Sequence, residues 1–371
     1  MSNGKDRTRV LVAMSGGVDS SLAAALLQTQ GYDVVGATIK TFCYGGFPGS
    51  SKTCCGLEGI ADARAVAHRL QIPHYVFDLE DEFTHDVIDD FVAEYARGRT
   101  PNPCVRCNSY TKFRDLLRRA NMLGCDRIAT GHYARVVRSN GHVQLRRAID
   151  RSKDQTYFLW GIDREVLHRL DLPLGESTKP EVRRRARELG LETADKPESF
   201  DICFVPDGDY AGFLATRLTD DHAAFQPGPV ATLDGKEIAT HDGYCRFTIG
   251  QRKGLPGGFS EPMYVVRIET DTRTVVIGPG SALNAELVSV GECNWLDEPP
   301  STGDEVSVQV RHRGRDIVGQ VEDRNHERVV VRLCDSHRAV TPGQSAAIYD
   351  GDVLLGGGRI EAEVSRSRLT S

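Results

Sequence analysis

Residues 9–21 read RVLVAMSGGVDSS and decide how the first part of the chain folds. Val10 to Met14 form a short apolar run with a β-prone bias, which predicts a buried strand. Ser15-Gly16-Gly17 breaks this run, and a helix with hydroxyl residues at its cap is expected to open at Ser20. A strand that turns through glycines into a helix N-terminus presents backbone N–H groups and the positive end of the helix dipole. We therefore expect a phosphate to bind at this turn.

Two common phosphate-binding fingerprints do not occur in this loop. It lacks the lysine of G-x-x-x-x-G-K-[ST] and the spacing of G-x-G-x-x-G. The pattern S-G-G-x-D-S resembles instead that of the pyrophosphate-loop ATPases, which bind the β- and γ-phosphates here and cleave ATP to AMP and pyrophosphate. The competing interpretation is a plain glycine turn between a core strand and a helix.

Strands and helices alternate through the first half of the chain. Strands are expected at 32–39, 74–78, 126–130 and 143–148, and amphipathic helices at 58–70 and 82–96. This alternation predicts a doubly wound parallel α/β sheet with ligands at the carboxyl ends of its strands. Residues 100–108 read TPNPCVRCN, and the two prolines predict a stiff, non-helical loop. From about Gly208, short alternating runs predict one or two small β domains, the last of them a barrel.

Composition narrows the classes of function. The chain has 371 residues, a net charge of −6 and ten cysteines. It contains no apolar run of about 18 residues, so no membrane-spanning helix is expected, and its start lacks a secretory signal, which predicts a cytoplasmic protein. Because that compartment is reducing, its cysteines are more often metal ligands, redox groups or nucleophiles than members of structural disulfides. The negative charge argues against indiscriminate nucleic-acid binding but allows local basic faces.

Three polar features follow the expected strands. His132 is either a satisfied structural histidine or a functional one, and its place at a strand end beside Gly131 favours function. Lys153-Asp154-Gln155 lies in a polar loop that would by default be solvated surface. The expected helix at 179–189 carries four arginines, which form either an exposed face or a contact for RNA phosphates.

Seven motifs together resemble the bacterial tRNA-specific 2-thiouridylases of the MnmA type. In order they are S-G-G-V-D-S, T-P-N-P-C-V-R-C-N, T-G-H-Y, K-D-Q-T-Y-F-L, D-I-C-F-V-P, T-I-G-Q-R-K-G-L and T-P-G-Q-S-A, and they span about Arg9 to Ile360. The resemblance implies transfer of sulfur to C2 of wobble uridine 34 in tRNA with ATP and Mg²⁺. It implies a sulfur donor protein as partner, either a cysteine desulfurase or a persulfide relay. It also implies three parts: a catalytic α/β domain at 1–207, a small β-rich central domain at 208–282 and a tRNA-contacting C-terminal β-barrel at 283–371.

The resemblance also assigns roles to individual residues. The C2 oxygen of the uridine is adenylated, Cys203 carries the sulfur as a persulfide, and Cys107 is the nucleophile that releases it by disulfide exchange. ATP would be bound by Ala13, Met14, Ser15, Gly16, Gly17, Val18, Asp19 and Ser20, with Ile39 and Gly131 bordering its adenosine. Asn102, Pro103 and Cys104 would lie against the target base. The remaining tRNA contacts would be His132, Lys153, Asp154, Gln155, Arg311, His312 and Gln344.

Cys104 departs from the family pattern, because well-known members carry an aspartate there as the suggested general acid/base. A thiol with an unperturbed pKa of about 8.5 is a poor substitute for a carboxylate. The change creates Cys104-x-x-Cys107, which together with Cys203 is a three-point ligand set for a [4Fe–4S] cluster with one iron open to sulfide. Persulfide chemistry without a cluster, and a structural zinc, are the alternatives.

Two other functions compete with thiolation. Another pyrophosphate-loop tRNA-modifying ligase, such as a lysidine synthetase, would need no paired thiols. An RNA-binding module with a vestigial ATP loop would bind tRNA without releasing AMP.

Overall fold

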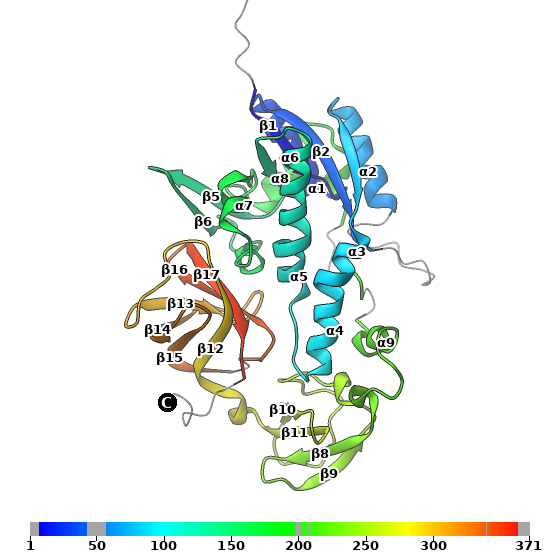
Figure 1. Ribbon diagram of the computed structural model, residues 1–371, viewed down its shortest axis with the longest axis vertical. Helices are drawn as coiled ribbons and strands as arrows, with labels where there is room; N and C mark the ends of the chain where they lie inside the picture. The colour runs from blue at the N-terminus through cyan, green and yellow to red at the C-terminus, as the bar shows by residue number, and fades with distance from the viewer. Residues whose placement is uncertain (1–6, 43–56, 198–201, 206–207, 339, 363–371) are drawn as a thin grey trace, which may run out of the picture. The chain divides into compact units, whose positions relative to one another are not determined.

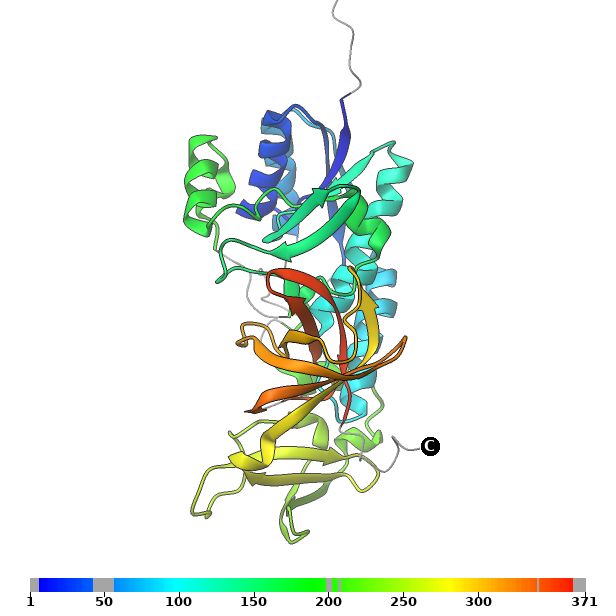
Figure 2. The ribbon, with the colours of Figure 1, turned by 90° about the vertical axis from the view of Figure 1, so that its left-hand side faces the viewer.

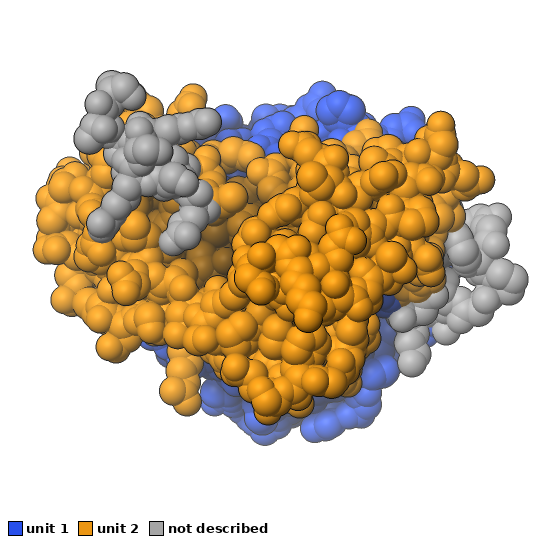
Figure 3. All heavy atoms as spheres, turned by 90° about the horizontal axis from the view of Figure 1, so that it is seen from below, with its two compact units in different colours: residues 1–87, 104–208, 352–354 blue, residues 88–103, 209–351, 355–371 orange. Residues whose placement is uncertain are grey.

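The computed structural model describes residues 7–42, 57–197, 202–205, 208–338 and 340–362. The chain forms two compact units that interleave in sequence (Figures 1 and 3). Unit 1 comprises residues 1–87, 104–208 and 352–354, and unit 2 comprises residues 88–103, 209–351 and 355–371. Asp201 and Pro206 are the first and last residues of the D-I-C-F-V-P motif, and both lie outside the described residues.

A parallel sheet of five strands, in the order β3-β2-β1-β4-β7, lies at the centre of unit 1. Its strands are β1 (Arg9–Ala13), β2 (Asp33–Lys40), β3 (His74–Asp78), β4 (Arg127–Ala129) and β7 (Leu170–Asp171). All neighbouring pairs in this sheet are parallel. The first four strands lie within one residue of the bounds expected from the apolar runs.

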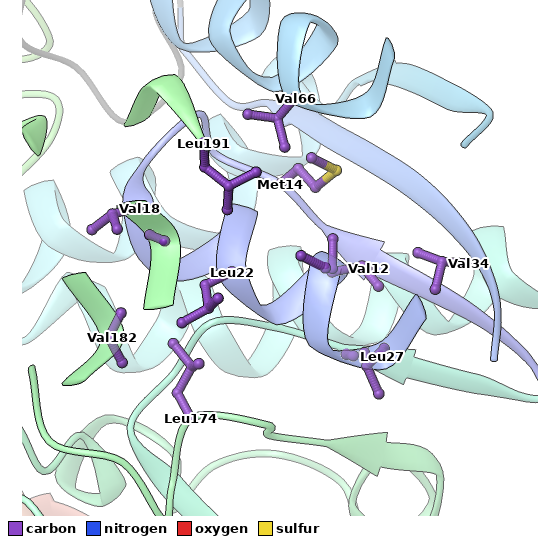
Figure 4. Close-up of a cluster of buried hydrophobic side chains, with 14 of the residues drawn as sticks. Val12, Met14, Val18, Leu22, Leu27, Val34, Val66, Leu174, Val182 and Leu191 are labelled. Atoms are coloured by element: carbon purple, nitrogen blue, oxygen red, sulfur yellow. The ribbon is translucent and has the colours of Figure 1, made fainter. Parts of the chain in front are cut away.

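Helices cover both faces of this sheet. On one face, α1 (Val18–Thr29), α2 (Leu57–Arg69) and α8 (Lys179–Glu188) share a buried cluster with Val10, Val12 and Met14 (Figure 4). The opposite face is covered by α6 (Asp115–Met122), which contacts β1 and β4 (Figure 2). The prediction of a doubly wound α/β sheet is therefore confirmed.

The remaining elements of unit 1 flank the sheet. They are α3 (Glu80–Phe83), a π-helical turn that begins at Thr84, α5 (Pro103–Arg106), the π-helical segment Cys107–Arg114, the hairpin β5 (Ala134–Ser139) and β6 (His142–Arg147), α7 (Arg164–Arg169), and 3₁₀ turns at Thr156–Phe158 and Glu192–Asp195.

Three local predictions need correction. The expected helix at 82–96 is helical but is interrupted by the π-helical turn Thr84–Ile88. Residues 100–108 are not a non-helical loop throughout, because α5 begins at Pro103. Proline lacks only an N–H that the first helical position does not use, so it starts a helix readily. Helix α1 begins at Val18 with Gly17 as its N-cap, ahead of the hydroxyl residues that were expected to cap it.

Unit 2 contains two β structures. A small sheet has the order β10-β11-β8-β9 and consists of β8 (Gly228–Thr232), β9 (Glu237–His241), β10 (Met263–Glu269) and β11 (Thr274–Pro279). The barrel consists of β12 (Asn284–Trp295), β13 (Glu305–Gln309), β14 (Ile317–Arg324), β15 (Val329–Arg338), β16 (Ser345–Asp350) and β17 (Val353–Ile360). Strand β12 pairs with both β15 and β17 and so closes the barrel around an aliphatic core. The expected central β domain and C-terminal barrel are confirmed.

The described part of unit 2 also contains the short helices α4 (Asp89–Ala96) and α9 (Tyr210–Ala215) and 3₁₀ turns at Ala223–Phe225, Tyr244–Arg246 and Gly280–Leu283. Within the described ranges, none of the helices has the length and apolar character needed to span a membrane.

Candidate active site

The positions expected to bind ATP gather at the carboxyl edge of the parallel sheet. Ala13, the last residue of β1, is in register with Ala37 of β2, and Val12 is in register with Ala129 of β4. Ile39 lies two residues beyond Ala37, and Gly131 lies two residues beyond Ala129. Because parallel strands end at the same edge, the loop after β1 lies beside both positions.

Two glycines in this region have no room for a side chain. Gly16 has φ +74°, and a Cβ there would lie 2.2 Å from the carbonyl oxygen of Gly59 in α2. A Cβ on Gly131 would lie 2.6 Å from the carbonyl carbon of Asp19 and 2.7 Å from the backbone nitrogen of Ser20. The backbone after β4 therefore packs directly on the first turn of α1, which leaves no room for a side chain at position 131.

Serine hydroxyls brace the turn but do not cap the helix. Ser20 and Ser21 donate to the carbonyl of Gly17 at 3.1 and 2.9 Å, and the Ser15 N–H donates to Ser20 Oγ at 3.1 Å. Gly17 is extended at the N-cap and offers no side-chain cap bond. The positive end of the twelve-residue helix α1 thus has no side-chain oxygen to satisfy its cap, which suits a phosphate ligand.

Asp19 of the S-G-G-V-D-S motif is engaged by Lys179, which the sequence did not single out for this site. The Lys179 ammonium lies 2.8 and 2.7 Å from the two carboxylate oxygens of Asp19, and the Tyr133 hydroxyl donates to Oδ1 at 2.8 Å. The Lys179 side chain is only 9% exposed, and its Nζ lies 5.6 Å from the centre of the Tyr133 ring. A largely buried cation thus stands at the turn where phosphate is expected.

The local sequence explains how Lys179 reaches this place. Thr178 and Glu181 form a capping box, with the Thr178 N–H donating to Glu181 Oε2 at 2.7 Å, so α8 begins at Lys179. The Lys179 N–H also donates to Asp150 Oδ2 at 3.0 Å. The T-x-x-E pattern before a helical run could have located this helix start. Only the fold shows that this start faces Asp19.

Two of the four arginines of α8 contact the segment that follows the helix. Arg183 donates to the carbonyls of Ala194 and Lys196 at 2.7 and 3.1 Å, and Arg187 pairs with Asp195 at 2.7 Å. These contacts hold the helix against the 3₁₀ turn that follows it. They give Arg183 and Arg187 a structural role, whereas Arg184 and Arg185 are exposed and their contact with RNA phosphates stays a prediction.

Cys104 and Cys107 lie three residues apart at the start of a helix. Cys104 is exposed and Cys107 is buried. The helix is held by its own polar side chains: Asn108 Nδ2 donates to the carbonyl of Phe158 at 3.2 Å, and Ser109 Oγ donates to the carbonyl of Val105 at 2.8 Å. Gly161 packs closely on this helix, because a Cβ there would lie 2.3 Å from Ser109 Oγ.

Cys203, the third thiol of interest, lies in a short described turn of unit 1 and is partly exposed. Its neighbour Phe204 is buried and packs edge-on against Phe83 of α3, with ring centroids 5.8 Å apart. Among the residues that the structure describes, which include all three thiols, no three His, Cys, Asp or Glu side chains converge as metal ligands. The arrangement therefore gives no support to a [4Fe–4S] or zinc site on Cys104, Cys107 and Cys203.

His132 follows β4 and is half-buried at the carboxyl edge of the sheet. Its Nδ1 lies 2.7 Å from Thr130 Oγ1, and its ring lies 5.6 Å from the ring of Phe113. Desolvation, followed by the nearby charge of Lys112, lowers the pKa of His132 to about 3. The imidazole is therefore neutral at physiological pH and can share hydrogen bonds but cannot act as a cation toward phosphate.

Two residues of the Lys153-Asp154-Gln155 trio have internal partners. Asp154 pairs with Arg147 at 3.2 Å, both side chains being 6% exposed, and accepts the Ala148 N–H at 2.8 Å. Gln155 Oε1 accepts the Tyr133 N–H at 2.8 Å. Both residues therefore order the segment next to Tyr133. Their contact with tRNA stays a prediction.

The remaining expected tRNA contacts belong to unit 2. Arg311 and His312 are exposed in the turn after β13. Gln344 Nε2 donates to the carbonyls of Thr100 and Pro101 at 3.0 and 3.2 Å, which lie just before Asn102 and Pro103.

Comparison with known proteins covers nearly the whole chain. Three family models match: the tRNA methyl transferase HUP domain over residues 8–207, the tRNA methyl transferase PRC-barrel domain over 216–279 and the aminomethyltransferase beta-barrel domain over 286–360. Among solved structures, the U34-tRNA thiolase NcsA from Methanococcus maripaludis with its [4Fe-4S] cluster is 19% identical with a TM-score of 0.36, covering 53% of this chain and 62% of that one. This likeness is too weak to carry an argument.

Curated relatives are much closer. The tRNA-specific 2-thiouridylase MnmA of Rhodospirillum centenum is 47% identical over 367 residues, covering 96% of this chain and 93% of that protein. The protein of the same name from Geotalea uraniireducens is 43% identical over 376 residues, covering both chains completely. Identity at this level over the full length shows that the chain belongs to the MnmA family of tRNA-specific 2-thiouridylases.

Proposed function

We propose that this protein is an ATP-dependent tRNA-uridine 2-sulfurtransferase that replaces the C2 oxygen of uridine 34 with sulfur. The observation that carries the proposal is full-length membership of a family whose curated members are named tRNA-specific 2-thiouridylases. The glycine turn, the Asp19–Lys179 pair and the two thiols Cys107 and Cys203 supply chemistry that suits this reaction.

The first step activates a poor leaving group. The C2 oxygen of uridine attacks the α-phosphorus of ATP, pyrophosphate leaves, and the oxygen becomes part of an AMP ester. The turn at residues 13–20 would bind the β- and γ-phosphates through backbone N–H groups, with Ile39 and Gly131 beside the adenosine. Lys179 would share its charge between Asp19 and a phosphate oxygen and so stabilise the departing pyrophosphate.

Magnesium fits this arrangement. Asp19 would supply a carboxylate oxygen and ATP would supply phosphate oxygens, and Mg²⁺ prefers both kinds of ligand. The ion would then neutralise part of the negative charge on pyrophosphate.

The second step transfers sulfur. The terminal sulfur of a Cys203 persulfide attacks C2, and AMP departs with the original oxygen. The Cys107 thiolate then attacks Cys203 Sγ, which breaks the sulfur–sulfur bond, leaves a thiocarbonyl on the base and forms a Cys107–Cys203 disulfide. An external thiol reduces this disulfide, and a sulfur donor protein reloads Cys203. Asn102, Pro103 and Cys104 would lie against the base, and His132, Lys153, Asp154, Gln155, Arg311, His312 and Gln344 are the proposed tRNA contacts.

The test is reconstitution with unmodified tRNA, ATP, Mg²⁺, cysteine and a cysteine desulfurase. We expect 2-thiouridine at position 34 together with AMP and pyrophosphate. Cys203→Ser and Cys107→Ser should release AMP but form no thiolated tRNA, and Cys334→Ser, which alters an exposed barrel thiol, should retain full activity.

Two outcomes would favour the rival functions. Modification that survives both thiol substitutions would indicate another pyrophosphate-loop ligase. Tight tRNA binding without AMP release, unchanged by Asp19→Ala, would indicate an RNA-binding module.

A further inference from the structure

A line of hydrogen bonds joins β3, the edge strand of the parallel sheet, to the start of the glycine turn. His74 is the first residue of β3, and its Nε2 atom lies 2.9 Å from Thr38 Oγ1 of β2. The Thr38 hydroxyl lies in turn 2.7 Å from the carbonyl oxygen of Met14, the residue that follows β1. Thr38 is only 1% exposed, so its hydroxyl is shielded from water. We call this line the β3 relay, and all of it belongs to unit 1.

The direction of each bond in the β3 relay follows from the groups involved. A carbonyl oxygen can only accept, so the single hydroxyl proton of Thr38 goes to Met14. Thr38 Oγ1 must then accept from His74, which places the ring proton on Nε2. Desolvation, followed by the charge of Arg64, lowers the pKa of His74, so the ring is neutral near pH 7. Its Nδ1, which is buried without a hydrogen-bond partner among the described residues, then carries no proton.

Gly36 of β2 makes room for the His74 ring. The two residues are in register across β2 and β3, and Thr38 lies two residues further along on the same face of the sheet. A Cβ on Gly36 would lie 3.0 Å from His74 Cδ2 and 2.8 Å from Met14 Sδ. The absence of a side chain at position 36 therefore lets the ring lie over β2 and reach Thr38.

The effect of the relay extends beyond Met14 because a peptide unit is planar. The carbonyl of Met14 and the N–H of Ser15 belong to one unit, so holding the first sets the direction of the second. The Ser15 N–H donates to Ser20 Oγ at 3.1 Å, and Ser20 Oγ donates to the Gly17 carbonyl at 3.1 Å. That carbonyl shares its peptide unit with the N–H of Val18, the first residue of α1. The first N–H groups of a helix lack partners inside it and are the donors that bind phosphate.

We infer that His74 and Thr38 are positioning residues for ATP, because through the Met14 carbonyl they orient the first peptide of the glycine turn. This role rests on the proposed ATP-dependent thiolation and concerns its first substrate alone. A turn that is ordered before ATP arrives binds more tightly, since ordering it then costs no further free energy. Loss of the relay should therefore weaken the binding of ATP and leave the affinity for tRNA unchanged.

The test measures the Kd for labelled ATP by equilibrium dialysis with Mg²⁺ and without tRNA. Thr38→Val keeps the shape of the side chain but removes the hydroxyl, and we expect the Kd to rise about tenfold, the size typical of one lost hydrogen bond. Thr38→Ser keeps the hydroxyl and should stay within about twofold of wild type. Thr29→Val is the matched control, because the Thr29 hydroxyl also donates to a backbone carbonyl, that of Ala25 at 2.8 Å. It should bind ATP as wild type does.

Variants of His74 test whether the relay acts as a chain. His74→Leu should raise the Kd for ATP, and His74→Gln should raise it less, because its amide can still donate to Thr38. Adding His74→Leu to Thr38→Val should cause no further rise, since the histidine acts only through the hydroxyl. His74 is partly exposed, so its two variants decide the question even if Thr38→Val fails to fold.

Three results would overturn the inference. The first is a folded Thr38→Val protein that binds ATP as tightly as wild type, and the second is an equal loss in Thr38→Ser, which would trace the effect to packing. The third is unchanged ATP affinity in His74→Leu, or a loss that simply adds to that of Thr38→Val. A wild-type protein that binds no ATP would instead refute the proposed function itself.

Discussion

The glycine turn at residues 14–19 and the thiol helix start at residues 103–108 place reactive groups in opposite ways. The glycine turn would bind phosphate through its backbone, and a Cβ added to Gly16, or to Gly131 packed against Asp19, would collide with neighbouring backbone. The thiol helix start would act through side chains on a helix that is held by polar contacts such as that of Asn108 with Phe158. Adding a methyl group to a glycine of the first region should abolish activity, whereas the second region should tolerate a substitution of the exposed Cys104.

Gly16→Ala is expected to have the largest effect. The methyl group would meet the carbonyl of Gly59 at a residue with φ +74°, so the turn must shift away from the phosphate position. AMP release and thiolation should both be lost, as measured by thin-layer chromatography of labelled ATP and by tRNA mobility. Gly124→Ala is the control. Gly124 has φ +64°, and an added Cβ would meet nothing within 4 Å, so this substitution costs only about 1–2 kcal/mol of backbone strain. Normal AMP release by Gly16→Ala would contradict this account of the turn.

Lys179→Met should come next, with AMP release reduced about a hundredfold because pyrophosphate loses a positioned cation. The rate of AMP release at saturating ATP is the quantity to measure, with the melting temperature as a check on folding. Lys196→Met removes a lysine that pairs with Asp62 elsewhere in unit 1 and should leave AMP release unchanged. Equal losses in the two variants would show that the Lys179 effect is only structural.

Cys104 substitutions should have a smaller effect and distinguish the sulfur chemistries. We expect Cys104→Ser to keep thiolation within about tenfold of wild type and Cys104→Asp to match or exceed wild type, since a carboxylate is the better acid/base group. Protein purified without oxygen should contain far less iron than the about four atoms per chain of a [4Fe–4S] cluster. Stoichiometric iron that is lost together with activity in Cys104→Ser would overturn the persulfide route.

The smallest expected effect is that of His132 on the pH dependence of stability. Its pKa is about 3 in the folded protein and near 6.5 when unfolded, so the unfolded state binds more protons between these values. The free energy of unfolding should therefore rise with pH up to about 6.5 and fall as the solution becomes more acidic. Urea titrations of His132→Asn from about pH 4 to 7 should show a shallower slope than wild type. An unchanged slope would place the acid sensitivity elsewhere.

The sequence predicted the parallel sheet well, because apolar runs and glycines act locally. The strands around the glycine turn were placed within one residue. The sequence could not place Lys179 in the site. The start of its helix leaves a local pattern, but the pairing of Lys179 with Asp19 joins residues 160 positions apart. The sequence also misjudged residues 100–108, where prolines indicated a loop but Pro103 occupies the one helical position that suits it. The bond from Gln344 to Thr100 spans 244 residues and leaves no local pattern.

The return of residues 352–354 to unit 1 has a consequence for the order in which the protein can be made. The Asp352 carbonyl accepts the Arg147 N–H at 2.9 Å, its carboxylate pairs with Arg135 at 2.9 Å and with Arg151, and Val353 pairs with Arg146 of β6. The nucleotide-binding unit therefore lacks part of its own structure until translation has nearly ended. A nascent chain that stalls in the barrel, or a gene truncated after residue 207, would leave the β5–β6 hairpin without this strand partner.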